Sequence, residues 1–175
     1  MSGIPITLGR TVRRAPSGPP VAWAEAARQA TELTDRVAAR FTAHTHHVLA
    51  TLTASGAPRV SGTEVGWWGE ELWLGSMLGA RKAEDLRADP RFALHSNPGD
   101  GTMRGGDAKV SGLVVEVGEG AVLDAFLAAN DVPQPLHLFF LRLQAVTLTE
   151  VADDGGALVI TTWRSGEAVS TIRRT

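Results

Sequence analysis

Short runs of apolar and β-branched residues, separated by tight turn signals, constrain this chain more than any other feature of its sequence. One run covers 48–53 and stops at Ala54-Ser55-Gly56-Ala57-Pro58, and further runs follow at 59–68 and 72–76. Runs of this length between turns that contain glycine or proline are typical of antiparallel strands. They predict three consecutive strands in a meander.

Further strands are expected in the second half of the chain. Residues 92–95, 108–117 and 158–163 have the composition of strands, and 136–151 is long enough for a pair of them. Gly112 interrupts the run 108–117, as glycines at strand irregularities do. At least six strands with few helices predict a closed or partly closed antiparallel barrel.

Three segments have helical patterns. Good helix formers at 80–89 stop at Asp89-Pro90, and 122–129 forms a second short segment. The longest segment, 22–42, has apolar residues at spacings of three or four. These place one face of a helix against a sheet: Ala26, Ala30, Leu33, Val37 and Phe41.

A chain of 175 residues suits one domain with one core. Residues 1–20 are rich in proline and glycine and lack an apolar period, which predicts an irregular N-terminal arm before a folded domain at 21–175. Residues 97–106 are also glycine-rich and are expected to form a loop.

Composition excludes several classes of function. The chain has no cysteine, so disulfides, thiolate nucleophiles and Cys-ligated metal sites are excluded. A formal net charge of −2 favours neither nucleic acid nor an anionic membrane as partner. No run approaches the ~20 apolar residues of a membrane helix, and Arg13-Arg14 precedes no apolar stretch. We therefore expect a cytoplasmic protein with a small-molecule ligand.

A hydroxyl and two cations lie where a strand gives way to a helix. Ser76 ends the strand, and Arg81 and Lys82 open the helix. The helix dipole disfavours cations there, so a bound anion such as phosphate would offset their charge. The alternative interpretation is a pair of solvated surface cations.

The neighbouring strand begins with a third cation. Arg59 and Ser61 have the same side-chain parity and point to one face, and Gly62 would let a ring approach the backbone. An arginine that flanks a hairpin in solvent is the alternative.

These residues carry a family resemblance. Arg59 to Glu64, then Ser76 with Leu78-Gly79-Ala80-Arg81-Lys82-Ala83, and finally Trp163 with Arg173, resemble the FMN-contacting segments of pyridoxamine 5′-phosphate oxidase in order and separation. The resemblance covers the chain from about His47 to the C-terminus. It implies a mainly β fold, a six- to seven-stranded antiparallel split β-barrel with flanking short helices, which forms a homodimer and holds FMN at the dimer interface.

The same resemblance implies a set of cofactor-binding residues. Arg59, Arg81 and Lys82 would bind the phosphate with Ser76 nearby, and Trp163 and Arg173 would close the site. The full implied set is Arg59, Val60, Ser61, Gly62, Gly75, Ser76, Arg81, Lys82, Asp107, Trp163 and Arg173.

The substrate residues of a true pyridoxamine phosphate oxidase are missing. Glu64 stands where the oxidase has a lysine that helps to bind the substrate phosphate, and Val169-Ser170-Thr171 stands in place of its Arg-x-His pair. The segment 123–130 offers no tyrosine or arginine. The expected function is an FMN-dependent oxidoreductase that acts on an unknown small organic substrate, with no catalytic residue assigned.

Three alternatives remain open. A deazaflavin could occupy the same groove, because it too carries a ribityl phosphate, and a non-catalytic module could bind a cofactor without turnover. Haem is disfavoured. His44, His46 and His47 lie together before the first strand, but no carboxylate or cysteine stands nearby in sequence to complete a metal shell. We assign no metal site.

Overall fold

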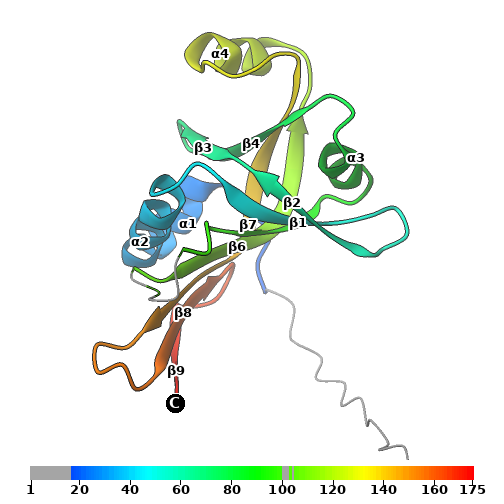
Figure 1. Cartoon of the computed structure of the whole chain (residues 1–175). Coiled ribbons are helices and arrows are strands. Elements are labelled where there is room, and N and C mark those ends of the chain that lie inside the picture. Colours follow the sequence, from blue (N-terminus) through cyan, green and yellow to red (C-terminus); the bar gives the residue numbers. More distant parts are fainter. Residues whose placement is uncertain (1–16, 100–102, 104) are drawn as a thin grey trace, which may run out of the picture.

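The computed structural model describes residues 17–99, 103 and 105–175. Most of the predicted arm 1–20, and residues 100–102 and 104 of the predicted loop, therefore lie outside the described residues. Within them the chain is mainly antiparallel sheet with short flanking helices, which confirms the predicted fold class (Figure 1). The described part has more strands than the six to seven predicted: β1 His47–Leu52, β2 Pro58–Thr63, β3 Val65–Trp68, β4 Glu71–Met77, β5 Arg91–His95, β6 Asp107–Val117, β7 Leu136–Val151, β8 Leu158–Arg164 and β9 Ser170–Arg174.

The strands follow the order β2-β1-β5-β6-β7-β4-β3, and β8 and β9 continue from β7. Consecutive strands β2 and β3 are therefore the two edges of this path, and Glu64 alone separates them. The sheet curls until its edges approach each other, yet it is not closed. The single strand predicted for 59–68 is thus two strands, and the meander is broken at Glu64.

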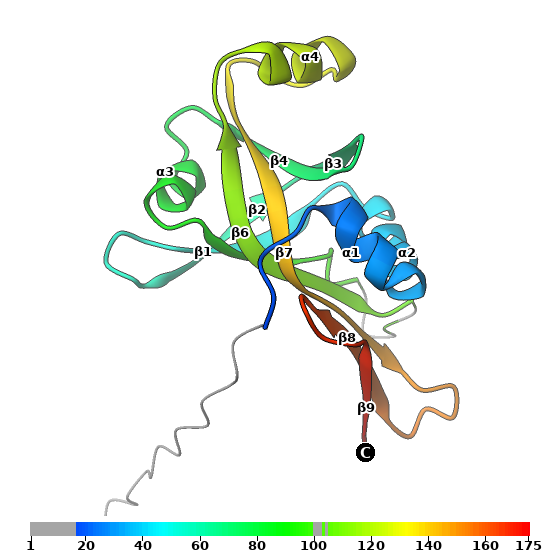
Figure 2. The same ribbon diagram turned by 180° about the vertical axis from the view of Figure 1, so that it is seen from behind.

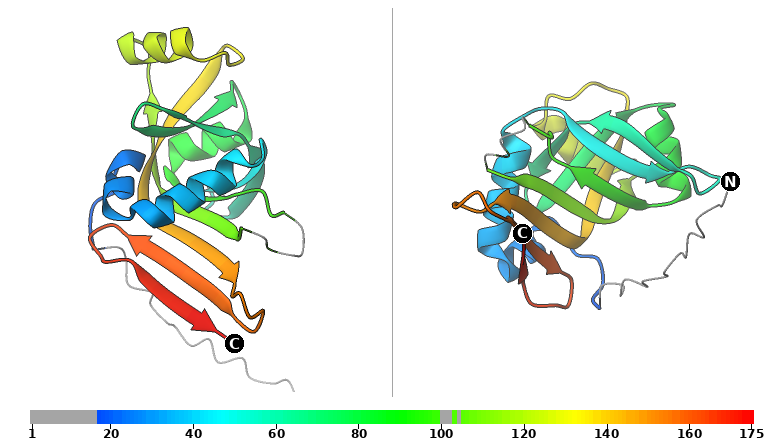
Figure 3. Two further views of the ribbon diagram at one scale, coloured as in Figure 1. Left: turned by 90° about the vertical axis from the view of Figure 1, so that its left-hand side faces the viewer. Right: turned by 60° about the horizontal axis from the view of Figure 1, so that its bottom comes forward.

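Strand β7 explains how the barrel splits. It pairs with β6 along most of its length, but on its other side Leu136 to Phe140 pair with β4 and Ala145 to Val151 pair with β8. Between the two sets, Val21 bridges Leu143. Figure 2 shows β6 and β7 running the length of the molecule, and Figure 3 shows β8 and β9 extending from the barrel. The strand pair predicted at 136–151 is wrong, since one continuous strand serves both parts.

Gly112 has the role that its position predicted. The register between β6 and β7 shifts at Ser111 and Gly112, and a Cβ atom on Gly112 would lie 1.9 Å from the carbonyl oxygen of Arg142. Only glycine lets the two backbones approach this closely at the bulge.

The helices cover the sheet. The segment predicted as one helix is two, α1 Trp23–Gln29 and α2 Thr31–Thr42, because Ala30 leaves the helical conformation with φ −147° and ψ 50°. The predicted apolar face is nevertheless buried throughout. The other helices are α3 Arg81–Ala88 and α4 Ala121–Ala129. None of the described helices has the length and apolarity that a membrane crossing needs.

Two apolar clusters hold these layers together. The larger lies between the sheet and α1, α2 and α3, and includes Leu33, Leu49 and Trp163. The smaller lies under α4 and consists of Phe126, Leu138 and Phe140, with Trp68 and Trp73 packed against it. Helix α4 therefore forms a separate apolar wall at one end of the barrel.

Candidate functional site

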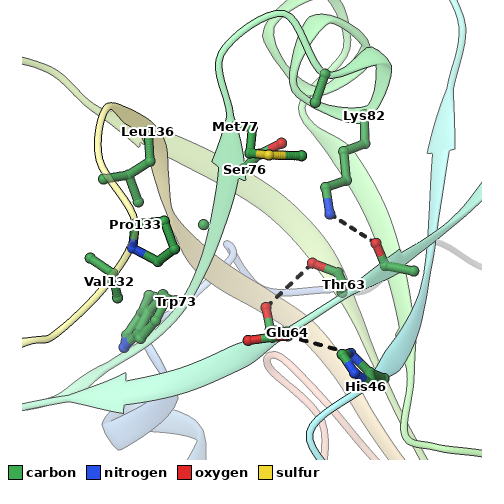
Figure 4. Close-up of a pocket in the computed structure, with 13 residues that line it drawn as sticks. His46, Thr63, Glu64, Trp73, Ser76, Met77, Lys82, Val132, Pro133 and Leu136 are labelled. Atoms are coloured by element: carbon green, nitrogen blue, oxygen red, sulfur yellow. Dashed lines mark hydrogen bonds and ion pairs between the residues drawn. The ribbon is translucent and has the colours of Figure 1, made fainter.

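A cavity of ≈ 300 Å³ opens between the end of β2, strand β4, the start of α3 and the segment before β7. This volume is at the lower end of the ~300–1,000 Å³ typical of small-molecule sites. Figure 4 shows side chains from these elements turned toward a common space. The cavity is lined by His46, Gly62, Thr63, Glu64, Trp73, Gly75, Ser76, Met77, Ala80, Lys82, Val132, Pro133 and Leu136.

Lys82 is the cation of the cavity. Its Nζ atom donates a 2.8 Å hydrogen bond to the carbonyl oxygen of Gly62, so helix α3 is tied to strand β2 (Figure 4). Burial lowers the pKa of the Lys82 ammonium, and the nearby Glu64 carboxylate raises it in part. A partly desolvated ammonium next to a cavity is a suitable partner for an anion.

Ser76 contributes an unsatisfied hydroxyl. The residue is 5% exposed, and its Oγ atom is buried and has no hydrogen-bond partner among the described residues. Buried polar groups are usually paired, so this hydroxyl keeps a hydrogen bond available for a water molecule or a ligand.

Trp73 forms the apolar floor. Its ring packs edge-on against Phe126 of α4, with ring centroids 4.9 Å apart and an interplanar angle of 79°. Gly66 on the paired strand makes room, because a Cβ atom there would lie 2.8 Å from the indole ring. Trp73, Gly75 and Met77 share one face of β4, and the Ser76 side chain lies on the other face with Leu72 and Leu74.

The structure brings some predicted residues together and places others elsewhere. Gly62, Gly75, Ser76 and Lys82 all line the cavity. Arg59 and Ser61 lie on the same side of the sheet as Leu49, and neither of them lines the cavity.

Two other predicted residues do not line the cavity. The Val60 side chain is on the opposite face of β2 from Arg59 and is 70% exposed. Arg81 is exposed and bonds to Glu84 at 3.2 Å.

Three predicted contacts lie farther along the chain. Trp163 is buried in the larger core cluster. Arg173 is on the β8–β9 ribbon, where its Nη2 atom donates to Asp154 Oδ2 at 2.5 Å. Asp107 begins β6, and its Oδ2 atom lies 3.9 Å from His95 Nε2. None of the three lines the cavity, and their cofactor contacts stay predictions.

Some lining residues carried no signal in the sequence. Thr63, Met77, Val132, Pro133 and Leu136 were not assigned, and the last three are far from Ser76 in the chain. They reach the cavity because Leu136 pairs with Met77 in the β4–β7 ladder. The histidine cluster is divided: His46 lines the cavity, whereas His47 is buried and accepts a 3.1 Å hydrogen bond from the Asn97 backbone. No group of side chains in the described ranges could hold a metal ion.

The sequence matches a known family over most of this structure. The family model for pyridoxamine 5′-phosphate oxidase matches residues 33–152. The chain belongs to this family. The matched segment contains the whole cavity, from His46 to Leu136. No curated protein matches the sequence.

Solved structures of low sequence identity have the family fold. PhzG from Burkholderia lata, in complex with tetrahydrophenazine-1-carboxylic acid, is 14% identical with a TM-score of 0.58, covering 82% of this chain and 90% of its own. A pyridoxamine 5′-phosphate oxidase-related, FMN-binding protein from Nostoc punctiforme is 11% identical with a TM-score of 0.56, covering 83% and 94%. A heme-binding protein from Mycobacterium smegmatis is 19% identical with a TM-score of 0.53, covering 81% of this chain but only 57% of its own.

The residues present fit the phosphate end of a flavin. A phosphate needs a cation and hydrogen-bond donors, and the cavity offers the Lys82 ammonium and the unpaired Ser76 hydroxyl. A ring system needs a flat apolar surface, which Trp73 and the glycines beside it provide.

Proposed function

We propose that this chain is an FMN-dependent oxidoreductase of the pyridoxamine 5′-phosphate oxidase family that acts on a small organic substrate. The observation that carries the proposal is the partly desolvated ammonium of Lys82, which lines the same cavity as Ser76, whose buried hydroxyl has no partner among the described residues. Bound FMN would supply the hydride or electron transfer, while the protein binds and orients it.

Different residues of the cavity would bind different parts of the cofactor. Lys82 and Ser76 would hold the phosphate, and the backbone at Gly62 and Gly75 would allow close approach of the ligand. The apolar segment Val132 to Leu136 and the Trp73 ring would exclude water from the opposite side. The FMN-binding relative from Nostoc punctiforme supports this cofactor by its shared fold.

We also propose that the protein is a cytoplasmic homodimer. The β8–β9 ribbon exposes the apolar side chains of Leu158 and Ile172, Val169 is exposed just before β9, and among the described strands β9 pairs only with β8, so its outer edge is unpaired. Exposed apolar strands of this kind are normally covered by a partner. A dimer would also bring residues of the ribbon near a second barrel.

The experiment that tests the cofactor compares ligands directly. The purified full chain is titrated with FMN, a phosphate-bearing deazaflavin and haemin, and absorbance and flavin fluorescence are followed. We expect FMN to bind with a perturbed flavin spectrum and to be reduced and reoxidised on the protein. Tighter binding of the deazaflavin would favour that cofactor, and binding of FMN without any turnover would indicate a carrier.

Haem binding is the second candidate, and one observation favours it. His46 lines the cavity, and relatives of the same fold from Mycobacterium smegmatis and Vibrio cholerae are heme-binding and heme-storage proteins. An imidazole is a common haem ligand. A Soret band with haemin that His46→Ala abolishes would support this function over the flavin.

A further inference from the structure

The cavity has two chemically different borders. One is apolar and is formed by Trp73, Met77, Val132, Pro133 and Leu136. The other is polar and charged, and Figure 4 shows that it consists of Lys82 on one side and Glu64 with His46 on the other. A ligand that fills the cavity therefore meets a cation at one point, a carboxylate at another, and an apolar wall opposite.

Glu64 holds a fixed place in this border because of the fold. It is the one residue between β2 and β3, where the chain passes from one edge of the sheet to the other. The Thr63 hydroxyl donates a 3.3 Å hydrogen bond to the carbonyl oxygen of Glu64. The Glu64 side chain is 63% exposed and lies 3.5 Å, Oε1 to Nδ1, from His46. The carboxylate is thus solvent-accessible at the cavity and is not buried in an ion pair.

Once a phosphate is bound, the cavity has more negative than positive charge, and Glu64 is not compensated. The Glu64 carboxylate is close enough to Lys82 to raise the pKa of its ammonium. A phosphate at Lys82 would compensate that ammonium and add further negative charge. His46 compensates Glu64 only while its ring is protonated. The loaded cavity would therefore repel a second anion and attract a cation.

We propose that Glu64 determines substrate specificity and that the substrate is an apolar or aromatic molecule carrying a positively charged nitrogen. Trp73 is assigned to the flavin ring, so the rest of the apolar border, Met77, Val132, Pro133 and Leu136, would contact the body of the molecule, and Glu64 would pair with its ammonium group. This inference rests on the proposed function, because it assigns the substrate class of the same cavity. A substrate phosphate or carboxylate is disfavoured at this position by like-charge repulsion.

Three probes of one size and different charge test the proposal: benzylammonium, benzyl alcohol and benzoate. Binding to the full chain is measured by ligand-observed NMR and calorimetry, with and without FMN. We expect benzylammonium to bind more tightly than benzyl alcohol, and benzoate most weakly. Glu64→Gln should weaken benzylammonium binding about two- to fivefold, as for one largely exposed charge pair, and leave benzyl alcohol binding unchanged. Glu64→Lys should reverse the preference in favour of benzoate.

The matched control is Glu119→Gln, which removes an exposed carboxylate outside the cavity and should change no probe affinity. Benzoate binding as tightly as benzylammonium, no detectable benzylammonium binding at millimolar concentration, or an equal loss in Glu119→Gln would overturn the proposal. The FMN titration separates the two claims. FMN binding without charge selection refutes the substrate class alone, and charge selection without FMN binding refutes the cofactor alone.

Discussion

The Nε atom of Arg59 donates a 2.7 Å hydrogen bond to Oδ2 of Asp85, and so joins strand β2 to helix α3. The Thr51 hydroxyl donates to the same oxygen at 2.7 Å, and Asp85 is only 6% exposed. Arginine offers five N–H donors in a planar fork, so the contact through Nε leaves others for a ligand. The pair therefore sets the position of α3, and with it the position of Lys82.

Asp85→Ala should destabilise the fold. The change removes a charge-assisted hydrogen bond and leaves the buried Thr51 hydroxyl without its acceptor, so we expect the free energy of unfolding to fall by about 2 kcal/mol. Urea denaturation measures the loss. Glu84→Ala on the same helix is the control, because Glu84 is exposed and its pair with Arg81 should contribute under ~0.5 kcal/mol. Equal losses in both variants would contradict the assigned role of Asp85.

Lys82→Ala should weaken FMN selectively. A charge-assisted bond to the phosphate is worth roughly 1.5–3 kcal/mol, so the dissociation constant should rise about tenfold to a hundredfold. Riboflavin, which has the ring without the phosphate, should bind the native protein poorly and lose little more in the variant. Fluorescence titration of both ligands decides the matter, since a folding defect would weaken both alike.

The same lysine predicts a pH dependence. Only the protonated ammonium binds phosphate strongly, and burial lowers the pKa of Lys82 from its ordinary value of 10.5. FMN affinity should therefore fall as the pH rises, beginning at a lower pH than for an exposed lysine. Lys82→Arg should keep its affinity over that range, because a guanidinium does not lose its proton. An identical alkaline decline in native protein and Lys82→Arg would assign the effect to another group.

His47 should make the fold sensitive to acid. The residue is 2% exposed, and burial lowers the pKa of its imidazole from the ordinary 6.5. The unfolded chain then binds the proton more tightly, so stability is complete above pH 6.5 and is lost as the pH falls below it, by at most about 1.4 kcal/mol per pH unit. His47→Gln should flatten urea midpoints measured between pH 7.5 and 5.5. His44→Gln, at an exposed position, should keep most of the native slope, because it leaves the burial of His47, the main cause of the lowered pKa, unchanged.

Local signals in the sequence predicted the elements well. Turn residues, helix formers and apolar spacing located α3, α4, most strands and the buried face from Ala26 to Phe41, because these patterns depend on neighbours in the chain. The errors have long-range causes. The helix is interrupted at Ala30, which is neither glycine nor proline, and the packing of Trp23 against Trp67 accompanies that break. The continuity of β7 depends on its pairing with β4, β6 and β8.

The cavity was predictable only where the residues that line it are near one another in sequence. Gly62, Gly75, Ser76 and Lys82 come from one hairpin-rich stretch and converge on the cavity. Val132 to Leu136 arrive through the β4–β7 ladder, which no local pattern encodes. The hydrogen bonds from Arg59 to Asp85 and from Arg81 to Glu84 likewise depend on tertiary geometry or rotamer choice.

The homodimer has a direct test. Light scattering at micromolar concentration should give twice the protomer mass. Ile172→Asp, which places a charge on the exposed strand β9, should shift the protein toward monomer without lowering protomer stability, because Ile172 is half-exposed in the protomer. Val122→Asp on α4, also exposed and apolar, is the control and should remain dimeric. A native monomer under these conditions would refute the proposal.

Ser76→Ala should act on stability and binding in opposite directions. The buried Ser76 hydroxyl has no partner among the described residues, so its desolvation is uncompensated and its removal should raise the free energy of unfolding by about 1 kcal/mol. If the hydroxyl serves a bound phosphate, FMN affinity should fall severalfold in the same variant.

Ser96→Ala is the matched control, because Ser96 is also buried but its Oγ atom accepts a 3.1 Å hydrogen bond from the Ala108 backbone. That variant should lose stability, because it leaves the Ala108 amide without its hydrogen-bond acceptor. Thermal melts with and without FMN, compared across the three proteins, separate the cases. A stabilised Ser76→Ala protein with weakened FMN binding would show a group kept for its ligand at a cost to the fold, whereas a destabilised one with native affinity would assign the hydroxyl to packing alone.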